Sequence, residues 1–185
     1  MRMTMETQLP TTETNNFAEL FKELRLKHLG EAIQSDFEEM SDSEKQAILK
    51  YLPRWISKEK TERKSQLIES RIRSAKFRKI QTVDTFNFKF SDATKSVEKN
   101  YLALFNTIDK NSPPSAVFTG NAGMGKTHLA RALGYASCQR TLSVFFITAA
   151  EMVNHLTHAQ KTFTLETELN RYRRPQVLII DELGY

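Results

Sequence analysis

The chain has 185 residues, 39% of them hydrophobic and 26% charged, which is the composition of an ordinary globular protein with one domain or two small ones. No apolar run is long enough to cross a bilayer, and residues 1–16 are polar, which predicts a disordered tail rather than a signal peptide. Cys138 is the only cysteine, so an internal disulfide is excluded and a cytoplasmic location is expected. The net charge of +5 favours an anionic partner.

Residues 17–80 are predicted to form a small all-helical region. The first helix follows a candidate N-cap at Asn16, and Gly30 is expected to end it; its apolar positions at helical spacing are Phe17, Leu20, Phe21 and Leu24. A second helical stretch is expected around residues 33–40.

Two further helical stretches are expected after residue 40. Ser41 and Glu44 form a capping-box pattern ahead of the first of them. Pro53 is expected to break that helix or to occupy the first turn of the next. The composition is again helical from Trp55, which we interpret as a helix-packing anchor, to about Lys79.

Positive charge is concentrated in residues 54–79, where ten basic and three acidic residues leave +7, more than the surplus of the whole chain. An acidic block precedes it at residues 36–44. Basic side chains that neutralise phosphates give salt-sensitive binding that is indifferent to sequence. We therefore interpret this segment as a DNA-contacting one, with a solvated helix face or a contact with the acidic block as alternatives; the candidate DNA-binding residues are Arg71, Arg73, Arg78 and Lys79.

Residues 81–114 are expected to link the helical region to a second domain. The stretch T-F-N-F-K-F at residues 85–90 alternates aromatic and polar residues, which predicts an extended segment with Phe86, Phe88 and Phe90 on one surface. The prolines of N-S-P-P-S at residues 111–115 predict a loop.

Strand and helix patterns alternate from residue 115 onward. Strands are expected at residues 116–119, 143–148 and 177–181, and helices at about 126–137 and from about residue 149. This alternation predicts a parallel sheet in an α/β domain.

The stretch G-N-A-G-M-G-K-T at residues 120–127 matches the P-loop, or Walker A, pattern in full, between an apolar strand and a helix. Its glycines let successive backbone N–H groups point at one phosphate chain, and the following helix N-terminus favours an anion. A chance glycine turn is the alternative. The pattern predicts binding of ATP with Mg²⁺, and the candidate residues are Gly120, Asn121, Ala122, Gly123, Met124, Gly125, Lys126, Thr127 and His128.

Four apolar residues run into Asp181 and Glu182 near the end of the sequence, which is the pattern of a Walker B strand. An aspartate at this place in P-loop enzymes holds Mg²⁺, and an adjacent glutamate can activate the attacking water. An acidic pair after a strand is weak evidence alone, but the P-loop upstream supports the functional interpretation. Lys126, which can reach the β- and γ-phosphates, and Glu182 are the candidate catalytic residues, and Thr127 and Asp181 are the candidate metal ligands.

Three stretches together resemble the IstB family, the ATP-binding helper proteins of insertion-sequence transposition, which are related to DnaC-type helicase loaders in the AAA+ class. They are GNAGMGKTHLARALGYASC, VFFITAAEMV and RPQVLIIDELGY, and the segment at residues 72–90 is also similar to the family's. The resemblance implies an ATPase that assembles as an oligomer on DNA and assists a transposase. By that resemblance the phosphate and Mg²⁺ roles fall on Lys126, Thr127 and Asp181, and the water-activating role falls on Glu182.

The resemblance also implies an AAA+ sheet with strand order 5-1-4-3-2, in which residues 116–119, 143–148 and 177–181 are strands 1, 2 and 3. Strands 4 and 5 would then lie beyond Tyr185, so we expect the chain to be a fragment or a truncated product without full ATPase activity. A DnaC-like helicase loader and a truncated remnant that binds nucleotide poorly are the alternative functions. His128, His155 and His158 form no metal-ligand pattern, and the basic residues before the last strand are expected in a solvated loop; they are Arg171, Arg173 and Arg174.

Overall fold

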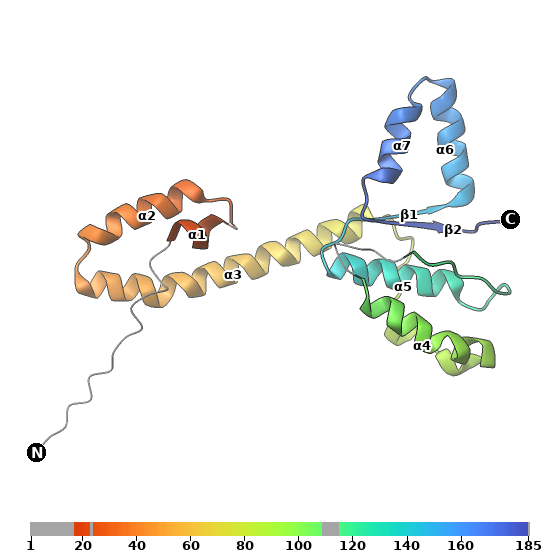
Figure 1. The fold of residues 1–185 in the computed structure, drawn as a ribbon, viewed down its shortest axis with the longest axis horizontal. Helices are drawn as coiled ribbons and strands as arrows, with labels where there is room; N and C mark the ends of the chain where they lie inside the picture. Colours follow the sequence, from red (N-terminus) through yellow and green to blue (C-terminus); the bar gives the residue numbers. More distant parts are fainter. Residues whose placement is uncertain (1–16, 23, 109–114, 185) are drawn as a thin grey trace, which may run out of the picture. The chain divides into compact units, whose positions relative to one another are not determined.

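The computed structural model describes residues 17–22, 24–108 and 115–184, so the predicted tail at residues 1–16 and the predicted proline loop's first four residues lie outside the described part. The chain divides into two compact units, unit 1 (Met1–Lys64) and unit 2 (Ser65–Tyr185), and the division falls within the long helix α3 (Figure 1). Each unit is described by itself below. The expected domain boundaries at residues 80 and 114 stay predictions.

Unit 1 consists of α1 (Phe17–Lys22), α2 (Lys27–Glu39) and the first part of α3 (Asp42–Ser74). Its core joins all three helices. The rings of Phe17 and Phe37 pack edge to face within it, with centroids 5.0 Å apart. The buried core residues are Phe17, Phe21, Leu24, Phe37, Leu52 and Ile56. The helices expected in residues 17–80 are therefore present in the described residues up to Ser74, where α3 ends earlier than the expected Lys79.

Gly30 does not end the first helix, contrary to the sequence prediction. The chain turns earlier, at Leu24 and Arg25, where Arg25 has a φ of 56° and the N–H of Leu26 donates to the Phe21 carbonyl. Gly30 lies buried inside α2. The apolar packing of α2 outweighs the helix-propensity deficit of glycine, which is about 1 kcal/mol.

Pro53 neither breaks nor begins a helix, because α3 continues through it. Proline cannot donate to the carbonyl four residues earlier, which costs about 3 kcal/mol in a helix interior. Leu52 and Ile56 on either side of it are buried in the unit 1 core, and this packing favours a continuous helix. One half of the predicted capping box is present: the Glu44 carboxylate accepts from the Ser41 N–H at 2.9 Å, and hydrogen bonds from Ser41 lower the Glu44 pKa.

Unit 2 begins with the last turns of α3 and continues through two short 3₁₀ helices, η1 (Val83–Thr85) and η2 (Phe88–Phe90), into α4 (Asp92–Asn106). The expected extended segment is thus replaced by turns, and the aromatic residues do not share one surface. Phe86 and Phe88 contact each other at 4.7 Å between centroids, whereas Phe90 is 70% exposed.

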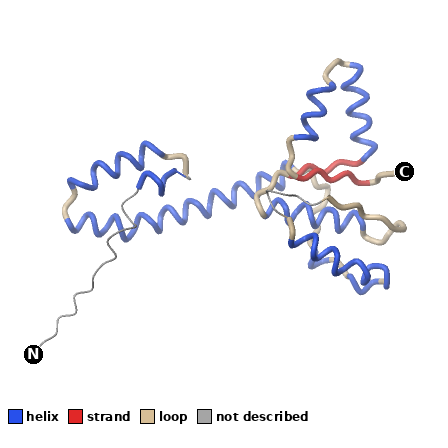
Figure 2. Tube along the Cα trace, viewed as in Figure 1, coloured by secondary structure: helices blue, strands red, loops and turns tan. Residues whose placement is uncertain are grey.

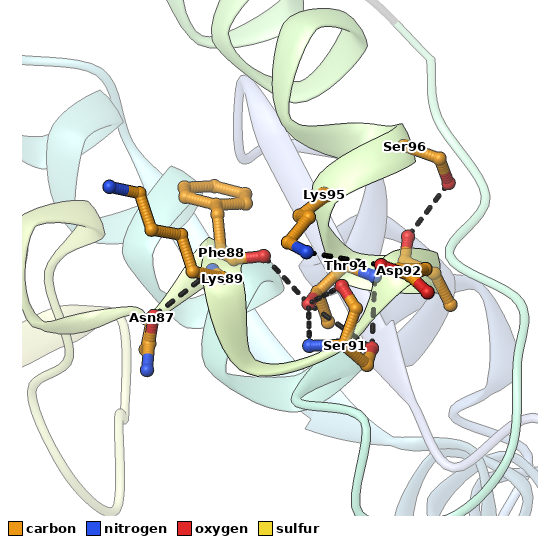
Figure 3. A network of polar contacts seen from close by, with 9 residues as sticks. Asn87, Phe88, Lys89, Ser91, Asp92, Thr94, Lys95 and Ser96 are labelled. Atoms are coloured by element: carbon orange, nitrogen blue, oxygen red, sulfur yellow. Dashed lines mark hydrogen bonds and ion pairs between the residues drawn. The ribbon is translucent and has the colours of Figure 1, made fainter.

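A local polar network causes this turn and starts α4 (Figure 3). Ser91 and Thr94 form a reciprocal capping box, and the Thr94 hydroxyl also donates to the Phe88 carbonyl at 2.8 Å. The Asn87 side chain accepts from the Lys89 N–H in the same way at η2. Side chains that bond neighbouring backbone groups compete with an extended conformation, which explains why the period-two pattern was misleading here.

The sheet of unit 2 has two parallel strands, β1 (Val144–Thr148) and β2 (Val177–Asp181), paired in register from Val144 with Val177 to Thr148 with Asp181. The strands predicted at residues 143–148 and 177–181, and their pairing as neighbours, are confirmed. On the outer side of β1, the Phe146 N–H donates to the Ala75 carbonyl just after α3, at 3.0 Å.

Helices cover both faces of this sheet (Figure 1). The helix α5 (Lys126–Gln139) packs on the face that carries Val144, Phe146 and Ile179, together with Ala75 and Cys138. The helices α6 (Ala149–Lys161) and α7 (Leu165–Arg173) cover the face with Phe145 and Ile147. Side chains alternate between faces along a strand, so each helix layer receives every second residue.

Two further predictions in this unit were wrong. Residues 116–119 form no strand (Figure 2), because none of the described segments offers them a backbone partner, and Val117 is 85% exposed. The expected solvated loop before β2 is mostly the helix α7, in which Arg171 and Arg173 pair with Glu168 and Glu166. Within the described residues, no helix is long and apolar enough to span a membrane.

Candidate nucleotide-binding site

Residues 120–125 form a glycine loop that leads directly into the N-terminus of α5. Gly123 and Gly125 have φ values of 79° and 80°, a left-handed conformation that other residues adopt only with strain. A Cβ on Gly125 would also collide with the Phe86 ring. The first turn of α5 leaves backbone N–H groups without intrahelical partners, so this end of the helix can bind an anion.

The ammonium group of Lys126 lies over its own loop. Its Nζ donates to the carbonyl of Gly120 at 2.7 Å and to that of Asn121 at 2.9 Å. A lysine ammonium has three donors, so one remains for another acceptor. These bonds hold the charge beside the loop, where a phosphate chain would need it.

The structure brings together the two residues predicted to hold the metal, which are far apart in the sequence. The Thr127 hydroxyl, in the first turn of α5, donates to Oδ1 of Asp181 at the end of β2 over 3.0 Å. The Glu182 N–H donates to the same oxygen at 3.1 Å. Hard oxygen ligands suit Mg²⁺, which usually keeps several waters and takes few protein ligands.

No group of three or more His, Cys, Asp or Glu side chains in the described ranges could hold a metal ion by itself. Thr127 and Asp181 would therefore supply only part of a coordination shell for a bound cation, and phosphate and water oxygens would complete it. Glu182 is exposed directly after β2 and has a φ of 58°, a strained value for a non-glycine residue.

The imidazole of His128 is engaged by the segment at residues 81–86. Its Nε2 lies 2.9 Å from the Thr82 carbonyl, which can only accept, so we assign the proton to Nε2. Its Nδ1 then accepts from the Gln81 amide at 3.0 Å. The Phe86 ring packs against the imidazole with centroids 5.2 Å apart. Any contact of His128 with nucleotide would therefore use its backbone, and the side chain fixes this segment beside the loop.

A cavity of about 1140 Å³ lies between the glycine loop and β2. It is lined by Gly123, Lys126, Thr127, Asp181 and Glu182 among others. Tyr101 ties α4 to α5, since its hydroxyl donates to the Leu129 carbonyl of α5 at 3.0 Å, and burial raises the pKa of this phenol. The arrangement can receive a chain of phosphates together with a small divalent cation.

The four candidate DNA-binding residues have different surroundings. Arg78 pairs with Glu151 at 2.9 Å, and Arg73 pairs with Glu69 at 3.7 Å. Arg71 is half-buried near Cys138, and its positive charge lowers the thiol pKa, which burial raises to about 11. Lys79 is exposed. The excess charge of this segment is thus partly neutralised within unit 2.

Sequence reasoning missed the packing of Gln81, Thr82 and Phe86 beside the glycine loop and the start of α5. Their contacts with His128 and Gly125 join residues about 40 positions apart, and no local pattern signals them. Only the aromatic content of this stretch gave a hint of packing.

A glycine loop opening a helix, with its threonine bonded to an aspartate at the end of a parallel strand, is typical of P-loop nucleotide-binding proteins. The family model described as IstB-like ATP binding protein matches residues 19–185, and the chain belongs to this family. Membership implies a P-loop fold and a nucleotide-binding site.

Individual relatives agree with this assignment. The chain is 34% identical over 135 residues to a Geobacillus stearothermophilus protein named for ATP binding in insertion sequence IS5376, covering 73% of this chain and 53% of that protein. It is 30% identical over 173 residues to a Bacillus thuringiensis protein named likewise for IS232, covering 93% of this chain and 66% of that protein. A shorter match, 33% over 66 residues, covers 36% of this chain and 15% of the chromosomal replication initiator DnaA of Aliarcobacter butzleri. The chain thus spans about half to two thirds of the length of its insertion-sequence relatives.

Proposed function

We propose that this protein is an AAA+ ATPase that binds ATP with Mg²⁺ and acts as a helper of DNA transposition. The observation that carries the nucleotide part is the hydrogen bond between Thr127 and Asp181, 54 residues apart in the sequence. The bond brings two oxygens together near the glycine loop, which supports a cation site shared with a bound phosphate.

Each residue has a defined task in this proposal. The loop at residues 120–125 and the α5 N-terminus bind the phosphates, and Lys126 pairs with the β- and γ-phosphate oxygens. Thr127 and Asp181 hold the cation, Asp181 through water. Glu182 orients the attacking water and accepts its proton. The cation, when bound, neutralises charge that develops on the transferred phosphoryl group.

Binding of a fluorescent ATP analogue to the chain, with Mg²⁺ and with EDTA, tests the nucleotide site. Lys126→Ala should weaken binding at least tenfold, because a charged hydrogen bond contributes about 1.5–3 kcal/mol. Lys161→Ala, which removes a lysine from the end of α6, is the matched control and should bind like the wild type. Equal affinity of the Lys126→Ala variant would contradict the assignment of the loop.

Two considerations support the transposition part. The relatives are named for insertion sequences, and the segment at residues 54–79 is basic. The proposed partners are DNA, mainly through its backbone, a transposase and further copies of the chain, and the proposed location is the cytoplasm.

A DnaC-like helicase loader is the second candidate, and the DnaA match is the observation that favours it. Co-purification from cells separates the two candidates. Recovery of a transposase with the protein supports the first, whereas recovery of a replicative helicase supports the second.

A further inference from the structure

Unit 1 exposes two aromatic side chains side by side on α3. Tyr51 and Trp55 are 40% and 59% exposed, and their rings stack with centroids 5.9 Å apart and planes 17° from parallel. Trp55 is therefore not the packing anchor that the sequence suggested; Leu52 and Ile56 serve the core from another face of the helix. Single exposed apolar residues are common, but here two nearly parallel aromatic rings lie together on one exposed face of a helix.

Three basic residues lie beside this pair on α3. Lys50, Arg54 and Lys58 recur every four residues on the same side of α3, and all three are exposed. The Lys50 ammonium lies 5.2 Å from the centroid of the Tyr51 ring. No acidic residue occurs between Lys45 and Lys58, and among the described residues no ion pair joins these three cations to an acid.

We propose that the aromatic–basic face of α3, formed by Lys50, Tyr51, Arg54, Trp55 and Lys58, binds single-stranded nucleic acid. Unpaired bases stack on the exposed rings of Tyr51 and Trp55, and the cations contact the flanking phosphates. Every base has a flat face, so this stacking is tolerant of sequence, and adjacent phosphates supply the negative charge that the three cations lack.

The chemistry of the face decides between this partner and an acidic polypeptide. Carboxylates would use the cations alone and leave two large flat rings in water. The acidic block at residues 36–44 of a second copy has the same limitation, because its one aromatic residue, Phe37, is buried in the unit 1 core and cannot reach the rings. A strand with unpaired bases satisfies both the rings and the charges.

This inference adds a surface in unit 1 to the proposed function and rests on it only in sharing nucleic acid as a partner. The two can fail separately. Backbone contact by Arg71, Arg73, Arg78 and Lys79 predicts binding of duplex DNA, in which the bases are already stacked. The face of α3 predicts a preference for single strands that depends on Tyr51 and Trp55.

Trp55 is the only tryptophan of the chain, so its fluorescence reports on this face alone. The 185-residue chain is titrated at low salt with oligothymidylate of about 16 nucleotides and, separately, with a duplex of equal length. We expect the single strand to quench Trp55 and the duplex to quench it much less. Absence of quenching by the single strand, or equal quenching by both, would overturn the proposal.

Substitutions then separate the contribution of the aromatic rings to single-strand affinity from that of the charges. Tyr51→Ala should weaken single-strand binding about tenfold, because stacking on an aromatic side chain strongly favours binding. Trp55→Ala, followed by the anisotropy of a labelled oligonucleotide, should do the same. Phe163→Ala, which removes a 98% exposed ring from unit 2, is the control and should leave the affinity unchanged.

The role of the basic residues is tested with two triple variants that lose the same charge in unit 1. Lys50→Gln, Arg54→Gln and Lys58→Gln together should weaken binding and flatten its salt dependence, whereas Lys22→Gln, Arg25→Gln and Lys27→Gln should change both far less. Circular dichroism confirms that each variant keeps its helices. An equal effect of both triples, or Trp55 quenching by poly-glutamate or by raising the protein concentration alone, would show that another partner occupies this face.

Discussion

At the scale of single residues, the candidate site depends on side chains that bond to the backbone or to each other without any ligand. Lys126 donates to two carbonyls of its own loop, and Thr127 donates to Asp181. A site held in this way pays less conformational entropy on binding. Glu182 differs, because it is exposed and only its backbone N–H is tied to Asp181.

This difference predicts separate effects on binding and hydrolysis. In a chain of its relatives' length, Glu182→Gln should keep ATP affinity within about twofold and lower the hydrolysis rate about 10²–10⁴-fold, because a general base is removed and the metal ligand remains. Phosphate release and nucleotide binding are measured on the same preparation. Hydrolysis at the wild-type rate would exclude Glu182 as the base.

At the scale of elements, α5 connects the glycine loop to the sheet through close packing. A Cβ at Gly134 would lie 2.6 Å from Cδ1 of Ile179 on β2 and 2.9 Å from Cζ of Phe77. The helix therefore packs so closely on these two side chains that a Cβ at Gly134 would force them to shift. This close packing helps to bring Thr127 within hydrogen-bonding distance of Asp181.

Gly134→Ala should therefore destabilise the protein, although alanine normally stabilises a helix by about 0.5–1 kcal/mol relative to glycine. Overpacking against Ile179 costs about 1–3 kcal/mol, so the free energy of unfolding should decrease. Denaturant unfolding measures the change. An increase in stability would show that α5 and β2 are not in the close contact described.

A second prediction at this scale concerns the C-terminal part of α3 and the residues after it. Duplex DNA binding should weaken steeply with salt, and replacing Arg71, Arg73, Arg78 and Lys79 with Gln should flatten that slope. Because Arg78 and Arg73 already pair with Glu151 and Glu69 and Arg71 is half-buried, the exposed Lys79 should account for most of the change. Salt titrations of fluorescence anisotropy measure it, and an unchanged slope would mean that this charge faces another partner.

At the scale of the whole molecule, the segment before the glycine loop is held by side-chain packing rather than by the sheet. Phe118 packs near Tyr101, with ring centroids 6.2 Å apart, but residues 116–119 make no strand ladder. In the described residues the sheet consists of β1 and β2 alone, and the chain covers only part of its relatives' length.

We therefore expect the 185-residue chain to hydrolyse ATP much more slowly than a chain of its relatives' length. A loop whose preceding segment lacks backbone partners positions phosphates less precisely, and misplacement by about 1 Å can cost about 100-fold in rate. Steady-state turnover of both chains, each compared with its Lys126→Ala variant, measures the difference. Equal, Lys126-dependent turnover would show that the shorter chain is sufficient.

The sequence by itself determined the parts of the protein whose signals are local. The glycine loop, the start of α5 and the two buried strands follow from patterns within a few residues, where backbone freedom, capping and apolar runs act directly. The Ser41 and Glu44 cap was predictable for the same reason. These signals, together with the resemblance they carry, also sufficed to identify the family.

Only the tertiary structure decided the features that depend on distant partners. Residues 116–119 lack a strand because a strand requires a neighbour, and Pro53 lies within a helix because burial of Leu52 and Ile56 outweighs a lost hydrogen bond. The exposure of Trp55 and the engagement of His128 by Thr82 likewise depend on which surfaces other segments cover. Apart from proline, local propensity is worth about 1 kcal/mol or less per residue, so packing between segments can override it.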